Sequence, residues 1–214
     1  MSKANIGSRT SAAVATVLLL STTLAGIAMA KEQPNNSAHP SAPRTLHGAY
    51  GFSLAQTCVR TPFQAPPASG FDPVTKQLKV NGEFVSGFGS GVLHFERNGV
   101  ARIENALITE ISASQTAAGQ SPVSPGTKFG CTGNYQVQPG GKLTVVLSCE
   151  AAPPAAGLRV IIEPVEFEGF VGAGRSINLG TFKRDLSEVT VYSGTKAVQQ
   201  RQRICLQSLN LDQL

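Results

Sequence analysis

The clearest structural pattern in the chain is residues 131–149, which read CTGNYQVQPGGKLTVVLSC. Two runs of alternating residues flank Pro139-Gly140-Gly141, and such a pattern is typical of two antiparallel strands joined by a tight turn. We predict a type I turn with Gly141 in the left-handed conformation. In that register Gln138 pairs with Lys142, and the first and last residues of the stretch, both cysteines, lie directly opposite each other.

A second hairpin is centred on Arg97-Asn98-Gly99. A three-residue loop with a left-handed glycine places Phe95 opposite Ala101 on an apolar face and His94 opposite Arg102 on a solvent face. A two-residue loop would place Phe95 opposite Arg102 and mix the two faces, so the pattern favours the first register. We expect eight side chains from the two hairpins to point inward: Leu93, Phe95, Ile103, Tyr135, Val137, Leu143, Val145 and Leu147.

Strand patterns continue along the rest of the chain. Further expected strands are residues 48–54, 84–96, 158–170, 176–185 and a last one from 188 past Gly194 towards Arg203. This spacing is typical of an all-β meander, and eight strands close a barrel that has no free edges. We therefore predict a single antiparallel eight-stranded β-barrel with hairpin connections. Residues 197–209 also have helix propensity, so strand, helix and coil stay open for residues 200–214.

Three glycines, Gly87, Gly89 and Gly91, share one face of the expected strand 84–96. A nucleotide-binding loop would need the spacing GxGxxG followed by a helix, whereas this stretch reads GFGSG with no helix pattern after it. Glycines on one strand face permit tight coiling or close approach of a neighbouring strand. We favour that structural interpretation.

The first 30 residues have the features of an export signal. Lys3 and Arg9 precede an apolar run, residues 12–25, and Ala28-Met29-Ala30 has the small side chains of a cleavage site. We predict a signal peptide over 1–30, a flexible Pro/Ser/Asn-rich linker over 31–46, and a barrel domain over 47–214 with a proline-rich insert at about 58–75. The mature protein is then expected to be soluble, in a periplasm or outside the cell, without a membrane anchor.

Charge and histidine content exclude several classes of function. The formal net charge of +5 falls to +3 once Lys3 and Arg9 leave with the signal, and the basic residues are scattered apart from Arg201 and Arg203. A nucleic-acid partner is not expected, since phosphate binding needs a concentrated basic surface. His39 lies in the linker and His47 just beyond it, so only His94 lies within the body of the domain, and we expect no metal site and no cofactor.

Four cysteines in an exported chain indicate disulfides. The hairpin register selects Cys131–Cys149, and elimination leaves Cys58–Cys205. A plain eight-strand meander places Cys205 at the wrong end of the barrel for this second bond. The bond therefore requires the tail after Gln200 to fold back, or a further hairpin at Asn81-Gly82 to change the strand count.

Several short motifs recur in order along the chain: GAYGF at 48–52, FERNG at 95–99, GNYQV at 133–137 with GG at 140–141, and SGTKA at 193–197. Over residues 48–200 the chain resembles a broad group of bacterial secreted proteins whose GxYxF and FxxNG strands imply a small barrel similar to that of allene oxide cyclases. The chain lacks the acidic FDGNG-type turn and the terminal Arg-Gln of that group. The resemblance implies the fold and no catalytic residue.

Few residues suggest chemistry. Glu163, Glu166 and Glu168 could supply paired carboxylates, although alternating acids on a strand are usually a solvated face. Asn105 and Tyr135 fall on the apolar, interior parity, where a polar group must be paired and either satisfies the structure or orients a ligand. We take them as candidate ligand-binding residues.

Two hypotheses about function follow. The first is an exported barrel that binds a small apolar ligand or serves a structural or interaction role, and the alternative is a cofactor-free isomerase or cyclase acting inside the barrel. Residues 61–73 could offer Phe63 and Phe71 to a partner protein, but we favour a role for these rings in capping one mouth of the barrel.

Overall fold

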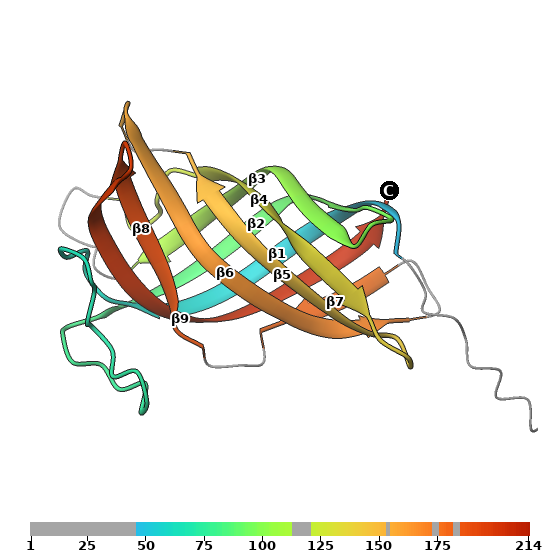
Figure 1. Cartoon of the computed structure of the whole chain (residues 1–214), viewed down its shortest axis with the longest axis horizontal. Helices are drawn as coiled ribbons and strands as arrows, with labels where there is room; N and C mark the ends of the chain where they lie inside the picture. The colour runs from blue at the N-terminus through green and yellow to red at the C-terminus, as the bar shows by residue number, and fades with distance from the viewer. Residues whose placement is uncertain (1–45, 113–120, 153–154, 173–175, 182–184) are drawn as a thin grey trace, which may run out of the picture. The chain divides into compact units, whose positions relative to one another are not determined.

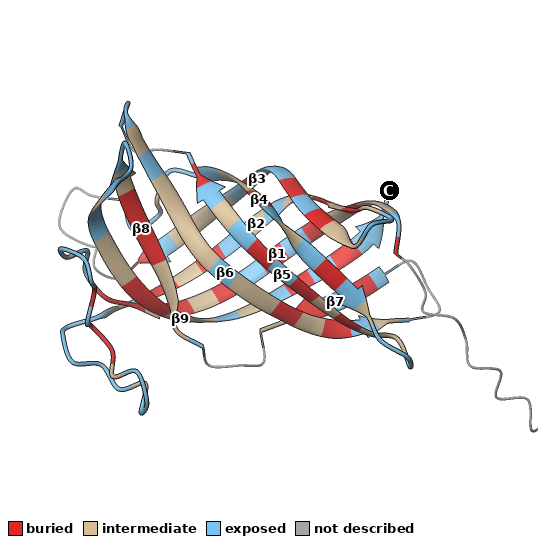
Figure 2. Cartoon of the chain, viewed as in Figure 1, coloured by how far each residue is buried: buried red, intermediate tan, exposed pale blue. Residues whose placement is uncertain are grey.

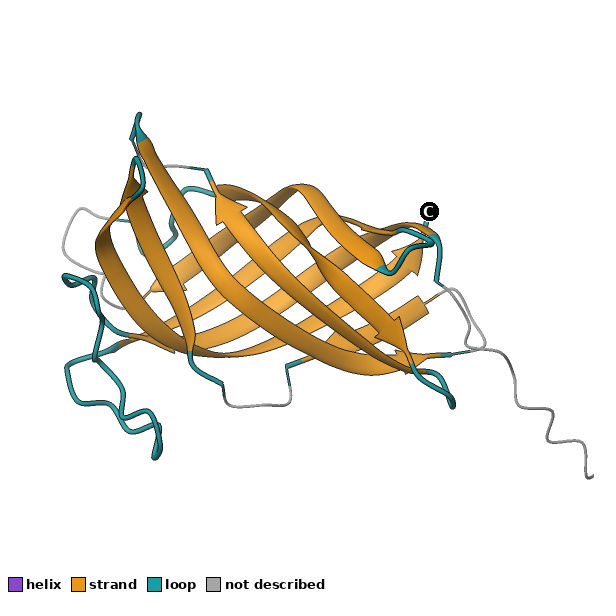
Figure 3. Ribbon diagram, viewed as in Figure 1, coloured by secondary structure: helices purple, strands orange, loops and turns teal. Residues whose placement is uncertain are grey.

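The protein is an all-β barrel. The computed structural model describes residues 46–112, 121–152, 155–172, 176–181 and 185–214, and the expected signal peptide and most of the linker lie outside these ranges. Across the described residues there are nine strands and no helix (Figure 3). The strands are β1 (Gly48–Arg60), β2 (Glu83–Phe95), β3 (Val100–Ser112), β4 (Thr127–Val137), β5 (Lys142–Ala151), β6 (Leu158–Val171), β7 (Ser176–Gly180), β8 (Ser187–Ser193) and β9 (Lys196–Gln213).

The strands form one closed antiparallel sheet (Figure 1). Each strand from β1 to β6 pairs with the next, and β9 closes the barrel by pairing with β1. The short strands β7 and β8 both lie between β6 and β9, one at each end of that gap. The barrel therefore has eight strand positions, one of them filled by two segments, as the predicted meander requires.

The position of the last turn differs from the sequence-based prediction. We expected one strand to run through Gly194, but Gly194 has φ +60° and the chain reverses there between β8 and β9. Residues 187–193 thus continue the course of β7, and β9 is a separate 18-residue strand. This also resolves the question of residues 200–214, which are strand up to Gln213.

The predicted register of the β2–β3 hairpin is confirmed. Phe95 pairs with Ala101 and His94 with Arg102, while Gly99 has φ +83°. The side chains of Phe95 and Ala101 are buried, whereas Arg102 is exposed.

The predicted register of the β4–β5 hairpin is also confirmed, but its turn type is not. The Gln138 amide donates to the Lys142 carbonyl at 2.8 Å. Gly140 has φ +87° and Gly141 has φ +84°. A positive φ at the second central residue makes this a type II turn instead of the expected type I.

Both predicted cysteine pairs lie at disulfide distance, with S–S separations of 2.02 Å for Cys131–Cys149 and 2.11 Å for Cys58–Cys205. Cys58 and Cys205 are directly opposite each other on β1 and β9. The turn at Gly194 makes this possible, because it returns the last strand along β1. The hairpin proposed at Asn81-Gly82 is not needed, and neither residue is in a strand.

One half of the barrel interior is filled by side chains. All eight predicted inward residues belong to the core, Val137 being partly buried at its edge. Figure 2 shows buried positions alternating with more exposed ones along the strands. The Phe95 ring makes edge-to-face contacts with Tyr50 and Tyr135, at centroid distances of 5.3 and 4.9 Å. We call this half, where β1 begins and β2 ends, the closed end.

The glycines of β2 permit close packing, as predicted. A Cβ atom at Gly89 would lie 2.8 Å from the Leu107 carbonyl oxygen, and one at Gly91 would lie 2.9 Å from the Phe52 ring. The backbone of β3 and the Phe52 side chain of β1 therefore occupy the space that side chains at Gly89 and Gly91 would fill.

The insert between β1 and β2 is longer than predicted and begins later, spanning residues 61–82. Its first residues continue the pairing with β9, since the Gln64 amide donates to the Gln200 carbonyl at 2.9 Å. The Phe71 amide donates to the Gln202 side chain at 3.0 Å, and the Phe71 ring is buried. The insert is thus anchored to β9 at the end of the barrel opposite the closed end (Figure 1).

Candidate functional site

Tyr135, a predicted ligand-binding residue, lies in the closed end. Its hydroxyl is 2.6 Å from the carbonyl oxygen of Leu46 and 2.8 Å from that of Glu96. Burial raises the pKa of the phenol, and Tyr50 raises it further. The hydroxyl thus links the segment before β1 to the β2–β3 turn. This is a structural role for Tyr135, in place of the ligand-binding role.

The predicted interior position of Asn105, the other candidate, is wrong. Asn105 is exposed and has φ +53°, within a bulge where the β3–β4 register shifts between Ile103 and Ala106. The extra residue breaks the alternation on which the prediction rested. Ile103 and Ala106 are both buried, and Asn105 points away from the barrel interior.

The acidic residues of β6 do not form a catalytic pair. Glu166 and Glu168 flank the buried Phe167, and the Glu168 carboxylate is 3.0 Å from the Lys142 ammonium on the neighbouring strand. Glu163 lies in the bulge of the same strand, between Ile162 and Val165, and is partly exposed. Glu166 and Glu168 therefore belong to the outer face, as the solvated-face interpretation predicts.

The barrel interior is hollow at the end opposite the closed end. A cavity of about 450 Å³ lies there, and it continues towards the core into a smaller apolar space of about 60 Å³. Ile108, Phe129 and Ile162 line both spaces, so the two share a common apolar wall. Further apolar lining residues of the larger space are Ala151, Leu158, Val160, Val189 and Val191.

One side of this cavity is polar, and its side chains form a connected network. The Arg60 guanidinium contacts the carboxylates of Glu83 and Glu110, the latter at 2.7 Å. The Gln56 amide donates to Glu110 at 3.2 Å and accepts from the Gln207 amide at 2.9 Å. Arg60 is buried, so its charge is balanced inside the barrel by two carboxylates.

Two further arginines of β9, Arg201 and Arg203, line the cavity beside this network. Burial lowers the pKa of each to about 10; the nearby charge of Arg60 acts in the same direction, and the charge of Glu110 partly opposes it. The Nε–H of Arg203 donates to the Ser187 hydroxyl at 3.1 Å. The Arg201 guanidinium lies over the Phe63 ring, 4.4 Å from its centroid, while its Nε atom is buried without a hydrogen-bond partner.

Phe63 of the insert lies where the capping interpretation predicts, whereas Phe71 is not among the residues that line the cavity. Phe63 lines the cavity and is 38% exposed, so its ring lies at the mouth. Phe71 is 4% exposed and therefore offers no surface to a partner protein.

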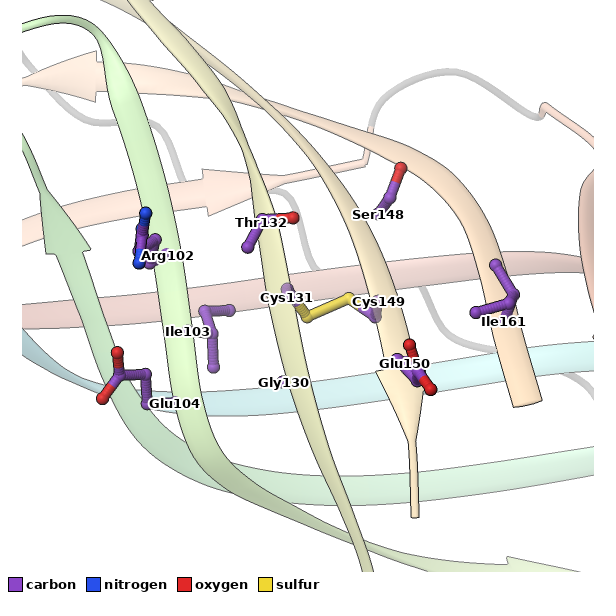
Figure 4. A pocket seen from close by; sticks show the side chains of 10 residues that line it. All are labelled: Arg102, Ile103, Glu104, Gly130, Cys131, Thr132, Ser148, Cys149, Glu150 and Ile161. Carbon is purple, nitrogen blue, oxygen red and sulfur yellow. A yellow bond between two sulfur atoms is a disulfide. The ribbon is translucent and has the colours of Figure 1, made fainter. Parts of the chain in front are cut away.

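A second hollow lies on the outer face of the barrel over β3 to β6 (Figure 4). The exposed side chains around it include Arg102 and Glu150, which pair with Glu96 and Arg159 at 3.1 Å. The Cys131–Cys149 disulfide lies beneath. These ion pairs are solvent-exposed and contribute little energy, and the hollow brings together no nucleophile with a base.

Sequence reasoning missed Arg60, Glu110, Arg201 and Arg203 as site residues. A usable signal was present: Arg201 and Arg203 share odd parity with Leu209 and Leu211, which are buried. Within the described ranges, no cluster of three or more His, Cys, Asp or Glu side chains could hold a metal ion. No helix in these ranges is long and apolar enough to cross a bilayer.

Comparisons with protein-family models, curated proteins and solved structures give no match to the chain. The interpretation of the site therefore depends on its geometry alone.

Proposed function

We propose that this protein is an exported barrel that binds one small, mainly apolar molecule in the cavity opposite its closed end. The observation that carries the proposal is the contrast between the two halves of the interior. The closed end is filled by side chains, whereas the other end keeps a cavity of about 450 Å³ with apolar walls and a few convergent polar groups. Ligand pockets typically have this size and composition.

Export is supported by the sequence and by the cysteines. The features of a signal peptide lie in residues 1–30, outside the described ranges. Both cysteine pairs are at disulfide distance, and none of the four cysteines is free. Disulfides persist in oxidising compartments, so the pairs favour a periplasmic or extracellular location.

Binding is better supported than the alternative of a cofactor-free isomerase or cyclase. Such an enzyme needs a group in the cavity that can give or take a proton. Glu110 lines the cavity, but its carboxylate is engaged by Arg60 and Gln56. Tyr135 is bound to two carbonyls at the closed end. Neither is available as an acid or base.

The proposal can be tested by filling the cavity. Val160→Phe adds a ring to its wall, and Val146→Phe makes the same change on the outer face, where Val146 is 37% exposed. With a neutral hydrophobic fluorophore, we expect saturable binding to the wild type and to Val146→Phe, and at least a tenfold weaker affinity for Val160→Phe. The absence of saturable binding to the wild type, or equal affinity for all three proteins, would contradict the proposal.

A further inference from the structure

We propose that the ligand carries a single anionic group, such as a carboxylate or sulfonate, and that Arg201 and Arg203 bind this group while its apolar body occupies the cavity. This inference rests on the proposed function and adds the chemical class of the ligand. It starts from the distribution of charge around the cavity.

The carboxylates of Glu83 and Glu110, near the cavity, already form ion pairs. Arg60 pairs with both Glu83 and Glu110. Among the described residues, no acidic side chain forms an ion pair with Arg201 or Arg203. Arg60, Arg201, Arg203, Glu83 and Glu110 together carry a net charge of +1, and Arg201 and Arg203 are the members of this group without an ion pair among the described residues.

Glu188 of the neighbouring strand forms no ion pair with either arginine among the described residues. Its two carboxylate oxygens accept from the side-chain amides of Gln200 and Gln202, at 2.5 and 3.1 Å. These glutamines have the opposite parity to the arginines and are held by the insert, since Gln200 accepts from the Ala68 amide at 2.8 Å. The insert and Glu188 thus bind the side chains on the other face of β9, and on the cavity face the charges of Arg201 and Arg203 have no ion-pair partner among the described residues.

The two guanidinium groups are placed to act together. Residues two apart on a strand point to the same face with Cα atoms about 7 Å apart, and both arginines line the same cavity. Phe63 supports Arg201 from one side, and Ser187 holds Arg203 through its Nε–H. An anion between them would receive charge-assisted hydrogen bonds from both side chains.

The free-energy cost of burying Arg201 and Arg203 without an ion-pair partner also indicates an anionic ligand. A buried donor without a partner is destabilising, and the Arg201 Nε atom is such a donor. Burial lowers the pKa of both arginines, so each charge is poorly solvated where it lies. A bound anion would accept from the unpaired donor and stabilise both charges. A neutral molecule would leave the charges unpaired, and a cation would be repelled.

The apolar space fixes how such a ligand lies. Arg203 lines both the large cavity and its deeper apolar extension, whereas Arg201 lines only the large cavity beside Phe63 at the mouth. The anionic group thus sits on the polar wall, and the apolar body extends along Ile108, Phe129 and Ile162.

The test uses three probes of equal chain length: decanoate, decanol and decylammonium. Each competes with the neutral fluorophore for the wild type, for the double variant Arg201→Gln/Arg203→Gln and for the control Arg102→Gln on the outer face. For the wild type and control we expect decanoate to bind at least tenfold more tightly than decanol, and decylammonium to bind most weakly. In the double variant the affinity for decanoate should fall at least tenfold, with that for decanol unchanged within about twofold.

The outcomes separate the two proposals. If decanol binds but decanoate has no advantage in the wild type, or decylammonium binds as well as decanoate, the anion-binding inference is wrong and the proposed function stands. If no probe binds, the proposed function fails and the inference with it. The wild-type comparison among the three probes does not depend on whether the double variant folds.

Discussion

Cys58 of the first strand and Cys205 of the last lie directly opposite each other across the line where the barrel closes, 147 residues apart in sequence. The other disulfide, Cys131–Cys149, joins two strands of one hairpin and encloses only 18 residues. The Cys58–Cys205 bond therefore joins the first and last strands of the barrel. The Cys131–Cys149 bond reinforces a pairing between strands that are already neighbours in sequence.

The two disulfides should contribute differently to stability. In the chain-entropy model, closing the longer loop contributes about 5 kcal/mol and closing the shorter about 3 kcal/mol. We expect Cys58→Ala/Cys205→Ala to lose more free energy of unfolding than Cys131→Ala/Cys149→Ala, as measured by urea denaturation. The opposite order would show that the β1–β9 closure is weaker than the structure indicates.

The register of the β2–β3 hairpin makes the adjacent residues Phe95 and His94 differ sharply in their expected contribution to stability. Phe95 is 2% exposed among Tyr50 and Tyr135, so Phe95→Ala should cost about 3–5 kcal/mol. His94 faces outward, and His94→Ala should change stability by about 0.5 kcal/mol or less. Thermal and urea unfolding of both variants would reveal a register error if the two costs were reversed.

Tyr135→Phe tests whether the tyrosine is structural. The change removes the hydroxyl that reaches the Leu46 and Glu96 carbonyls, so it should cost about 1–3 kcal/mol in the free energy of unfolding. The affinity for the hydrophobic fluorophore should stay unchanged, since Tyr135 is outside the cavity lining. A selective loss of binding without loss of stability would return Tyr135 to the ligand site.

Arg201→Gln should leave the melting temperature of the ligand-free protein unchanged or raise it. The pKa of Arg201 in the folded protein, about 10, lies below the ordinary value of an arginine. The folded state therefore binds this proton less tightly than the unfolded state, and the cost of burying the charge is full below pH 10 and fades as the pH rises above 10. At neutral pH the substitution removes that cost.

Thermal unfolding at pH 7 checks this, with Arg60→Gln as the comparison. Arg60 is paired with two carboxylates, so its loss removes an ion pair from each and should lower the melting temperature. Equal decreases for the two variants would show that Arg201 is stabilised by a partner in the ligand-free protein.

The parts of the fold that sequence reasoning predicted are those with local determinants. Gly99 and Gly140-Gly141 mark turns, and the alternation around them fixes which residues face inward. The turn at Gly194 was missed although Ser193-Gly194-Thr195-Lys196 is a polar run typical of a turn, because the strand patterns on its two sides were taken as one strand. That one error moved Cys205 to the wrong end of the barrel and hid the position of Arg201.

The candidate site was harder to predict for two physical reasons. A bulge at Asn105 adds one residue and reverses the parity after it, which no pattern in the flanking residues announces. The cavity is lined by strands that lie far apart in sequence, such as β3 and β9. Its lining residues come together only when the barrel closes, so local sequence patterns do not predict it. Arginines at alternate positions were therefore read as surface charge.

The most direct test of the central claim is an NMR titration that follows assigned methyl groups during addition of decanoate. The account predicts saturable shifts for Ile108, Ile162 and Val191 in the cavity, with no comparable change for Leu143 at the closed end or Val146 on the outer face. Shifts confined to outer-face methyls such as Val146, with the cavity methyls unperturbed at saturation, would contradict a ligand site inside the barrel.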